Sequence, residues 1–240
     1  MSDNLQPRGA DDTTFAQPLY TPIKRRSFFM YAGATAGVTA LVLAGCSKNN
    51  DPVMPNNAIS LGAGDVGVLN YAYALEQLEA AFYARVVAAP ASDFQTGELA
   101  YFNEVSQHEA IHRDFFKAAI NRDAPGKLLQ NLTPNFTTID FTKRTSVLTA
   151  AQTFEDLGVA AYNGAGILIK TAAYLVIAGQ IVSVEARHAA YIRERLVPNS
   201  FSASPQIDAN GLDKAMMPVD VIAAAQAFIM EKLDASMVGK

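Results

Sequence analysis

Apolar residues recur at intervals of three and four over most of the chain after residue 64, the spacing of one face of a helix. Prolines and glycines interrupt this pattern and mark the ends of the apolar stretches. Asp65 is the expected N-cap of the first helix, and Pro218 suits the first turn of a shorter one. The pattern predicts helices over residues 65–88, 96–121, 142–163, 171–196 and 218–233.

The connections between these segments differ in length. The first and second helices are joined by a short turn, as are the third and fourth, so the partners in each pair should be antiparallel neighbours. About twenty residues separate the second helix from the third, enough extended chain to span a helix roughly 37 Å long. The sequence therefore predicts an all-α four-helix bundle over 65–196, with one long crossover between helices 2 and 3. Residues 197–240 form a C-terminal extension with one short helix.

Residues 1–46 resemble an export leader. Arg25 and Arg26 precede an uncharged apolar stretch, as in the twin-arginine signal. The stretch ends in Leu-Ala-Gly-Cys, which resembles a bacterial lipobox and implies that Cys46 is lipidated and becomes the new N-terminus. These resemblances imply an exported protein, anchored by lipid at the bacterial cell envelope, on its periplasmic or outer face.

The polar, proline- and glycine-containing segment 47–64 predicts a flexible tether between lipid and bundle. The alternative for the leader is a single transmembrane helix over residues 27–45 with an incidental cysteine. Cys46 is the only cysteine, which favours the lipoprotein hypothesis and rules out a disulfide within one chain.

Charge narrows the range of partners. The formal net charge is −4, and no basic run follows the leader. Nucleic acid is therefore not an expected partner.

Each of the four long predicted helices has one apolar face, called its seam below. All four seams contain acidic residues, and two also contain histidine. Each carboxylate would be costly to bury without a partner. The pattern repeats: Glu76 and Tyr83 in the first helix match Glu155 and Tyr162 in the third, and a Glu-x-x-His motif occurs in both the second and the fourth helix. The seam residues are Glu76, Glu109, His112, Glu155, Glu185 and His188.

A glutamate from each of two helices, together with Glu-x-x-His from the other two, is the ligand set of di-iron and di-manganese carboxylate bundles. Glutamate and histidine at i and i+3 project from one helix face, so both can reach the same metal pair. Carboxylate and imidazole ligands suit both Fe and Mn, and the sequence does not choose between them. The predicted cofactor is two ions of Fe or Mn.

The phrases LEQLEAAFY, EDLGVAAYNGA and VEARHAAYI resemble the ferritin-like superfamily, close to the ferritin-like domain group that includes desiccation-related proteins. The resemblance covers about residues 65–196 and implies that the six seam residues are the metal ligands, with Tyr83 and Tyr162 beside them as candidate catalytic residues. Glu79, one turn after Glu76, is the possible substitute ligand. Glu76 is preferred because its register matches Glu155, whereas Gly158 occupies the place of Glu79.

One feature departs from that family. Gly164 and Gly166 indicate a break in the third helix, which argues against iron storage of the ferritin type.

Two alternatives stand beside the dimetal hypothesis. The buried glutamates and histidines could form structural ion pairs in a member without metal. His108-Glu109-Ala-Ile-His112 also fits H-E-x-x-H, the zinc-peptidase helix, although that hypothesis leaves Glu76, Glu155, Glu185 and His188 without a role. In the bundle hypothesis His108 is an outer residue that orients ligands through hydrogen bonds.

A dimetal site of this kind is compatible with three classes of function. An enzyme would use peroxide or O₂ as substrate and act in oxidative-stress defence as an oxidase, a peroxidase or a catalase-like protein. A binding protein would hold iron or manganese at the envelope. A stress-associated lipoprotein would use its metal only to stabilise the fold.

Overall fold

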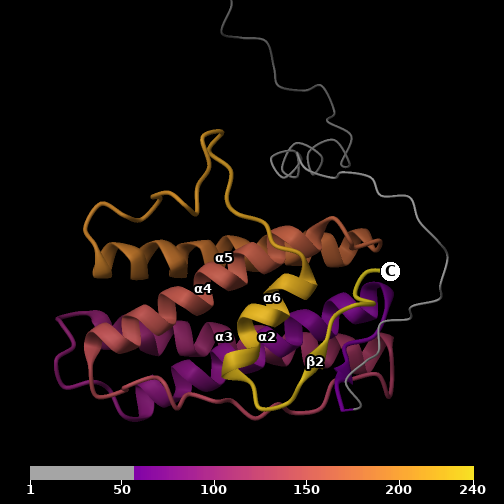
Figure 1. The fold of residues 1–240 in the computed structure, drawn as a ribbon, viewed down its shortest axis with the longest axis horizontal. Coiled ribbons are helices and arrows are strands. Elements are labelled where there is room, and N and C mark those ends of the chain that lie inside the picture. The colour runs from indigo at the N-terminus through magenta and orange to yellow at the C-terminus, as the bar shows by residue number, and fades with distance from the viewer. Residues whose placement is uncertain (1–56) are drawn as a thin grey trace, which may run out of the picture. The chain divides into compact units, whose positions relative to one another are not determined.

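The structure is a computed structural model that describes residues 57–240. Four long helices dominate it (Figure 1). They are α2 (Gly64–Ala88), α3 (Glu98–Asp123), α4 (Arg144–Gly166) and α5 (Ala172–Leu196), followed by the short α6 (Pro218–Ala225). The predicted all-α four-helix bundle with a short C-terminal helix is confirmed.

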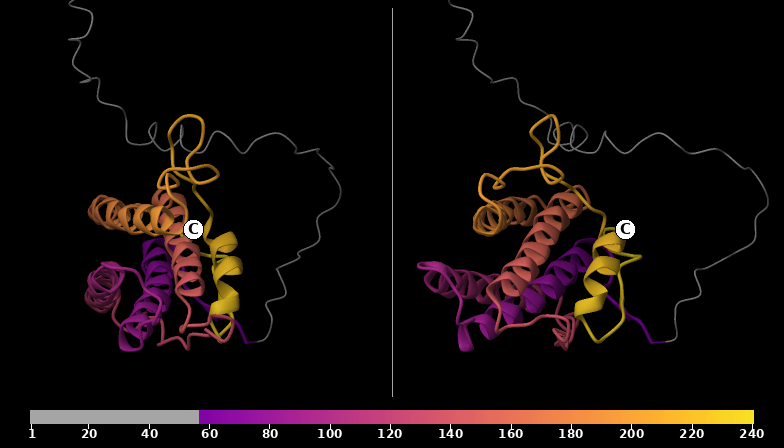
Figure 2. Two further views of the ribbon diagram at one scale, coloured as in Figure 1. Left: turned by 90° about the vertical axis from the view of Figure 1, so that its left-hand side faces the viewer. Right: turned by 60° about the vertical axis from the view of Figure 1, so that its left-hand side comes forward.

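The helices form two hairpins. Helix α2 packs along α3 and α4 packs along α5, while α2 and α4 bring the two hairpins together (Figure 2). The long connection from α3 to α4 crosses the base of the bundle in Figure 1, as the sequence predicts. Buried Asn70 and Gln77 of α2 hold this crossover: the Leu129 amide donates to Asn70 Oδ1 at 2.9 Å, and the Leu132 amide to Gln77 Oε1 at 2.9 Å.

Asp65 has a different role from the one predicted. Ala63 is the N-cap of α2, and Asp65 lies in the first turn. Its carboxylate accepts hydrogen bonds from the amides of Lys170 and Thr171, both at 2.8 Å. Asp65 therefore fixes the start of α5, a tertiary contact that a local capping pattern does not reveal.

The predicted break in the third helix is wrong. Helix α4 continues to Gly166. A Cβ atom at Gly164 would lie 1.8 Å from the carbonyl oxygen of Met216, and the Met216 amide donates to the Ala160 carbonyl at 2.9 Å. The glycine is therefore needed where the C-terminal extension crosses α4 at close range.

The C-terminal extension differs from its predicted form. Helix α6 gives way to the 3-10 turn η2 (Gln226–Phe228), and β2 (Leu233–Asp234) pairs in parallel with β1 (Ile59–Ser60). The flexible tether predicted for 47–64 does not extend through its last residues, because Leu61 is fully buried beside this pairing. Strands of two residues are too short to show a period in the sequence.

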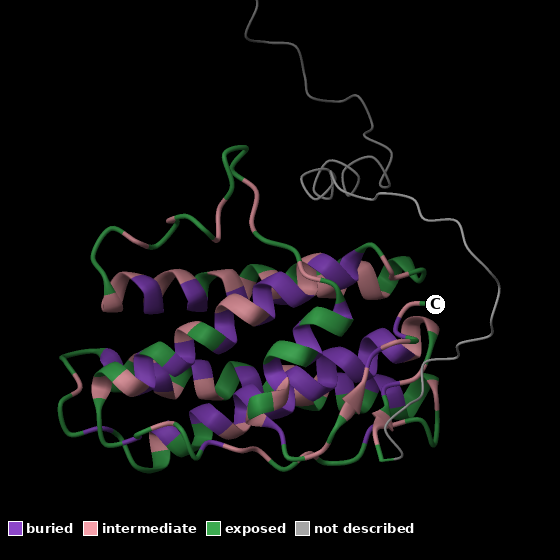
Figure 3. Ribbon diagram, viewed as in Figure 1, coloured by how far each residue is buried: buried purple, intermediate pink, exposed green. Residues whose placement is uncertain are grey.

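Buried residues line the inner faces of the helices, and the outer faces are exposed (Figure 3). The leader predicted for 1–46, with Arg25, Arg26 and Cys46, and the first part of the tether lie outside the described residues. Within 57–240, none of the helices combines the length and the apolar character that crossing a membrane requires.

Candidate metal centre

Each of the four long helices places one glutamate in the centre of the bundle. Glu76 of α2, Glu109 of α3 and Glu155 of α4 are fully buried, and Glu185 of α5 is 1% exposed. His188 is also buried, and the His112 side chain is 12% exposed. Four carboxylates in an apolar interior need compensating positive charge, because an unpaired buried ion is strongly destabilising.

The six predicted ligands form two overlapping groups. One consists of Glu76, Glu109, His112 and Glu185, with its candidate ligand atoms all within 4.8 Å of one another. The other, with the same spread, consists of Glu109, Glu155, Glu185 and His188. Glu109 and Glu185 belong to both groups, which is the arrangement in which two carboxylates lie between two ions. The structure thus brings together every residue of the predicted ligand set.

The histidine nitrogens lie among the carboxylate oxygens. His112 Nδ1 is 2.7 Å from Glu185 Oε1 and 3.6 Å from Glu76 Oε2. His188 Nδ1 is 3.0 Å from Glu109 Oε1 and 3.5 Å from Glu155 Oε2. Each Nδ1 atom therefore faces the centre of its group, the direction a metal ligand requires.

Most of the converging atoms are unsatisfied. None of these close approaches between histidine and glutamate has hydrogen-bond geometry. Metal ions would give these atoms the partners that they lack, and four glutamates carry the charge that balances two divalent cations. The donor set therefore fits two ions. The buried atoms without a hydrogen-bond partner are Glu76 Oε2, both carboxylate oxygens of Glu109, His112 Nδ1, Glu155 Oε2, both carboxylate oxygens of Glu185, and His188 Nδ1.

Protons take up part of the charge when no metal is bound. Burial is the main cause that raises the pKa of Glu76 to about 8, and the negative charges of Glu185 and Glu109 add to it, while His112 acts in the opposite direction. Burial lowers the pKa of the two histidines, but the surrounding glutamates outweigh this and raise both pKa values to about 12. Metal ions that enter the site must displace these protons.

The two candidate catalytic tyrosines contact the site in a crossed pattern. The Tyr83 hydroxyl of α2 donates to Glu155 of α4, and the Tyr162 hydroxyl of α4 donates to Glu76 of α2. Glu76 and Glu155 each belong to one ligand group only. In each of them one carboxylate oxygen accepts the tyrosine hydrogen bond, and the other oxygen faces the centre of the group without a partner. The tyrosines therefore orient the two carboxylates that are not shared.

His108 lies next to the site and outside both groups. Its Nδ1 is 3.0 Å from His188 Nε2, and the two rings stack with centroids 5.2 Å apart. With a metal on its Nδ1, His188 would carry the hydrogen on Nε2 and donate it to His108 Nδ1. This geometry does not favour the zinc-peptidase hypothesis, which needs His108 and His112 on one ion.

Glu79 is buried but belongs to neither group, so Glu76 is the better-placed ligand. Its carboxyl lies near Gly158: a Cβ atom at that glycine would be 3.0 Å from Glu79 Oε1. Burial raises the pKa of Glu79 well above its usual value, and the surrounding glutamates add to the effect, which favours the neutral form of its carboxyl.

One neighbour of the site was missed in the sequence. The Tyr101 hydroxyl of α3 donates to the His188 carbonyl at 3.0 Å, and its ring stacks on Tyr191 with centroids 4.0 Å apart. Tyr101 precedes Glu109 by eight residues, about two helical turns, so its position on the same face was a usable signal.

Comparison with known proteins agrees with this geometry. No curated protein matches the chain. A family model described as a ferritin-like domain matches residues 64–198, which is more than half of the chain and includes all four long helices and every candidate ligand. The chain therefore belongs to the ferritin-like domain family.

Proposed function

We propose that this protein is an exported, lipid-anchored dimetal protein that consumes hydrogen peroxide at the cell envelope, with two Fe or two Mn ions in the bundle. The observation that carries the proposal is the set of eight buried side-chain atoms without hydrogen-bond partners, distributed over two groups that share Glu109 and Glu185. Structural ion pairs would leave fewer such atoms unsatisfied, since buried polar groups are normally paired.

The residues have distinct tasks in this proposal. Glu76 and His112 would hold one ion, Glu155 and His188 would hold the other, and Glu109 and Glu185, which belong to both groups, would serve both ions. Two redox-active ions bound there would exchange two electrons with peroxide. His108 is exposed and His112 is partly exposed, so peroxide approaches from the side of the site where these two histidines lie.

The location rests on the leader. Arg25 and Arg26 would direct export through the twin-arginine route, and Cys46 would carry the lipid. Several acyl chains, at ~0.8 kcal/mol per buried CH₂, anchor a protein firmly. Cys46→Ser should leave an unlipidated, largely unprocessed precursor, and lysine at positions 25 and 26 should stop export. A mature N-terminus other than a modified Cys46 would refute this part of the proposal.

Peroxide consumption by the metal-loaded full chain tests the activity. Glu155→Ala should lower the rate to that of the same amount of free Fe or Mn in buffer, because one ion loses a ligand. Glu104→Ala is the matched control, since Glu104 is exposed on α3 away from the cluster. The competing hypothesis is a protein that only holds metal. It predicts tight binding with no more turnover than free metal, whichever residue is changed.

A further inference from the structure

The first half of α5 is apolar, yet the rest of the bundle does not cover it. Residues 171–184 contain no charged side chain, whereas residues 185–196 contain five. None of residues 171–180 is buried, and Val176 is 62% exposed. A helix that is apolar on every side is normally buried, and a surface helix normally turns charged residues outward. The start of α5 is therefore a surface suited to a partner.

Other apolar residues are exposed at the same end of the bundle. Ile167, in the turn from α4 to α5, is 53% exposed, and Met237 near the C-terminus is 47% exposed. Leu168 lies between these two segments, because a Cβ atom at Gly239 would be 2.5 Å from the Leu168 Cβ. We call Ile167, Leu168, Val176 and Met237 the apolar tip. Exposed apolar residues gathered in this way mark surfaces that bind a protein or a membrane.

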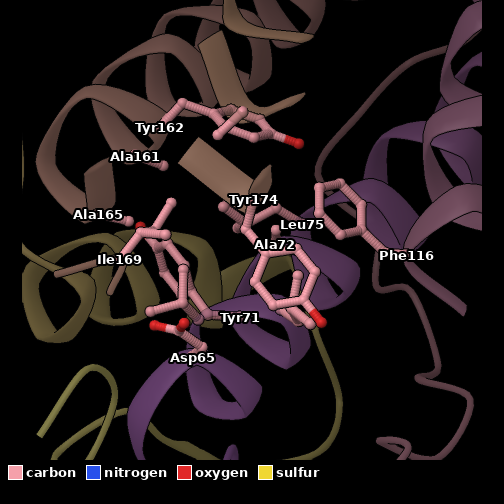
Figure 4. A pocket seen from close by; sticks show the side chains of 13 residues that line it. Asp65, Tyr71, Ala72, Leu75, Phe116, Ala161, Tyr162, Ala165, Ile169 and Tyr174 are labelled. Atoms are coloured by element: carbon pink, nitrogen blue, oxygen red, sulfur yellow. The ribbon is translucent and has the colours of Figure 1, made fainter. Parts of the chain in front are cut away.

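The interior behind the apolar tip is closed. The start of α2, the end of α4 and the start of α5 meet around a cavity of about 30 Å³, whose walls include Asp65, Ile169 and Tyr174 (Figure 4). This cavity has room for a water molecule but not for a ligand. Asp65 also binds the amides of Lys170 and Thr171 and so fixes the turn into α5. A partner of the apolar tip must therefore lie against its outer surface.

The chain enters the bundle at this same end. The Gly64 amide at the start of α2 donates to the Lys240 carbonyl at 2.9 Å, so both lie beside the apolar tip (Figure 1). Cys46, the proposed lipid site, precedes residue 57 by eleven residues. Eleven residues span at most roughly 36–40 Å, and the 25 residues of α5 are roughly 37 Å long. The opposite end of the bundle would need that segment fully extended to reach the membrane, whereas the apolar tip would not.

Basic side chains surround the apolar tip. Lys127, Lys170 and Lys240 are exposed around the starts of α2 and α5, and none of them forms an ion pair in the described part of the chain. The nearby Asp65 accepts two backbone hydrogen bonds, and Asp123 pairs with the arginine before it. Lysines beside exposed apolar side chains are typical of proteins that bind anionic lipid surfaces.

We propose that the apolar tip docks on the surface of the membrane that holds the lipid anchor, where the lysines meet anionic phospholipid headgroups. This inference rests on the proposed anchor and adds an orientation to it. Val176 is roughly 6 Å along the axis from the start of α5, within the ~5–10 Å that an apolar face enters a membrane surface. Glu185 is roughly 20 Å from that start, so the metal centre stays in water, where peroxide reaches it.

The test uses the protein isolated from bacterial membranes and reconstituted in vesicles of phosphatidylcholine and phosphatidylglycerol. A bimane label is attached to Val176→Cys or to Val197→Cys. Val197 is the matched control, because it follows the other end of α5 and is 61% exposed. A nitroxide-bearing lipid quenches a label at the membrane surface, and iodide quenches a label in water. We expect the label at position 176 to be quenched by the nitroxide lipid and the label at position 197 by iodide.

A charge in the apolar tip should release it. Ile167→Asp places a carboxylate where the side chain would enter the lipid, which is unfavourable for an ion. A label on Met237→Cys should then lose its quenching by the nitroxide lipid, whereas Val197→Asp should leave that quenching unchanged.

Nitroxide quenching at position 176 and not at position 197, with its loss at position 237 in Ile167→Asp, supports the inference. Equal quenching of positions 176 and 197 by iodide overturns it. Shielding of position 176 from iodide without quenching by the nitroxide lipid overturns it as well, and would mean that a second copy of the chain covers the tip. Failure of the anchor is distinguishable, because mass spectrometry would find Cys46 without lipid, and the inference would then fall with the anchor.

Discussion

The α2–α3 and α4–α5 hairpins are near-copies around the metal centre and differ just outside it. Each supplies one glutamate, a tyrosine seven residues later and a Glu-x-x-His motif, and each tyrosine binds the glutamate of the other hairpin. Two differences next to the site are Glu79 against Gly158 and His108 against Val184. The candidate ligands and the two tyrosines are thus duplicated, whereas Glu79 and His108 are not. We expect the duplicated residues to determine whether metal binds, and Glu79 and His108 to adjust how tightly it binds.

The largest effect is expected where the hairpins share ligands. Glu109→Ala or Glu185→Ala removes a carboxylate from both groups and should reduce binding from about two ions per chain to nearly none. Glu76→Ala or Glu155→Ala affects one group and should leave about one ion. Elemental analysis of the purified variants measures this, with Glu104→Ala as the control. Equal losses from all four variants would contradict the division into shared and unshared ligands.

Acidity should weaken binding in both hairpins. The pKa values of Glu76, about 8, and of the two histidines, about 12, mean that these groups hold protons at neutral pH in the metal-free protein. Since metal must displace the protons, affinity should rise with pH, about tenfold per pH unit for each proton displaced. Competition titrations between pH 6 and 8 test this sign. An affinity independent of pH would mean that the ligands are already deprotonated.

His108 tests the asymmetry between the hairpins. His108→Val gives α3 the residue that α5 has at the equivalent position, and it removes the hydrogen-bond partner of His188 Nε2. Affinity for the ion beside His188 should fall about tenfold, the lower end for loss of an outer hydrogen bond. The ion beside His112 should be less affected. A stepwise titration that shows both ions weakened equally would mean that His108 acts on the whole site.

The smallest effect on the metal site, and a measurable one on stability, is expected at the glycines of the second hairpin. Gly164→Ala should destabilise the fold by about 3 kcal/mol, because the new Cβ meets the backbone of Met216. Gly158→Ala meets only the movable end of Glu79 and should cost less than about 1 kcal/mol. Gly179→Ala, where the Cβ would meet open space, should stabilise by roughly 0.5–1 kcal/mol. Denaturant unfolding distinguishes the three.

The sequence predicted the bundle and the glutamate cluster correctly where the same helical periodicity placed both the apolar residues and the acidic residues on one face. The seam positions of Glu76, Glu109 and Glu155 predicted the bundle and the cluster together, because a carboxylate on an apolar helix face must meet others in the core. Features that depend on contacts between distant segments were not predicted. The hydrogen bond from the start of α5 to Asp65 leaves no local signal in the sequence. The close approach of the C-terminal extension to Gly164 leaves none either, and a glycine within a helical pattern was interpreted as a break.

We propose that two metal ions bind between the hairpins and share Glu109 and Glu185. Anomalous X-ray scattering from crystals of the protein loaded with Mn or Fe tests it most directly. We expect two peaks roughly 3.5–4 Å apart, the spacing of two-metal sites, one beside His112 and the other beside His188. A single peak bound by both His108 and His112, or no peak inside the bundle, would contradict it.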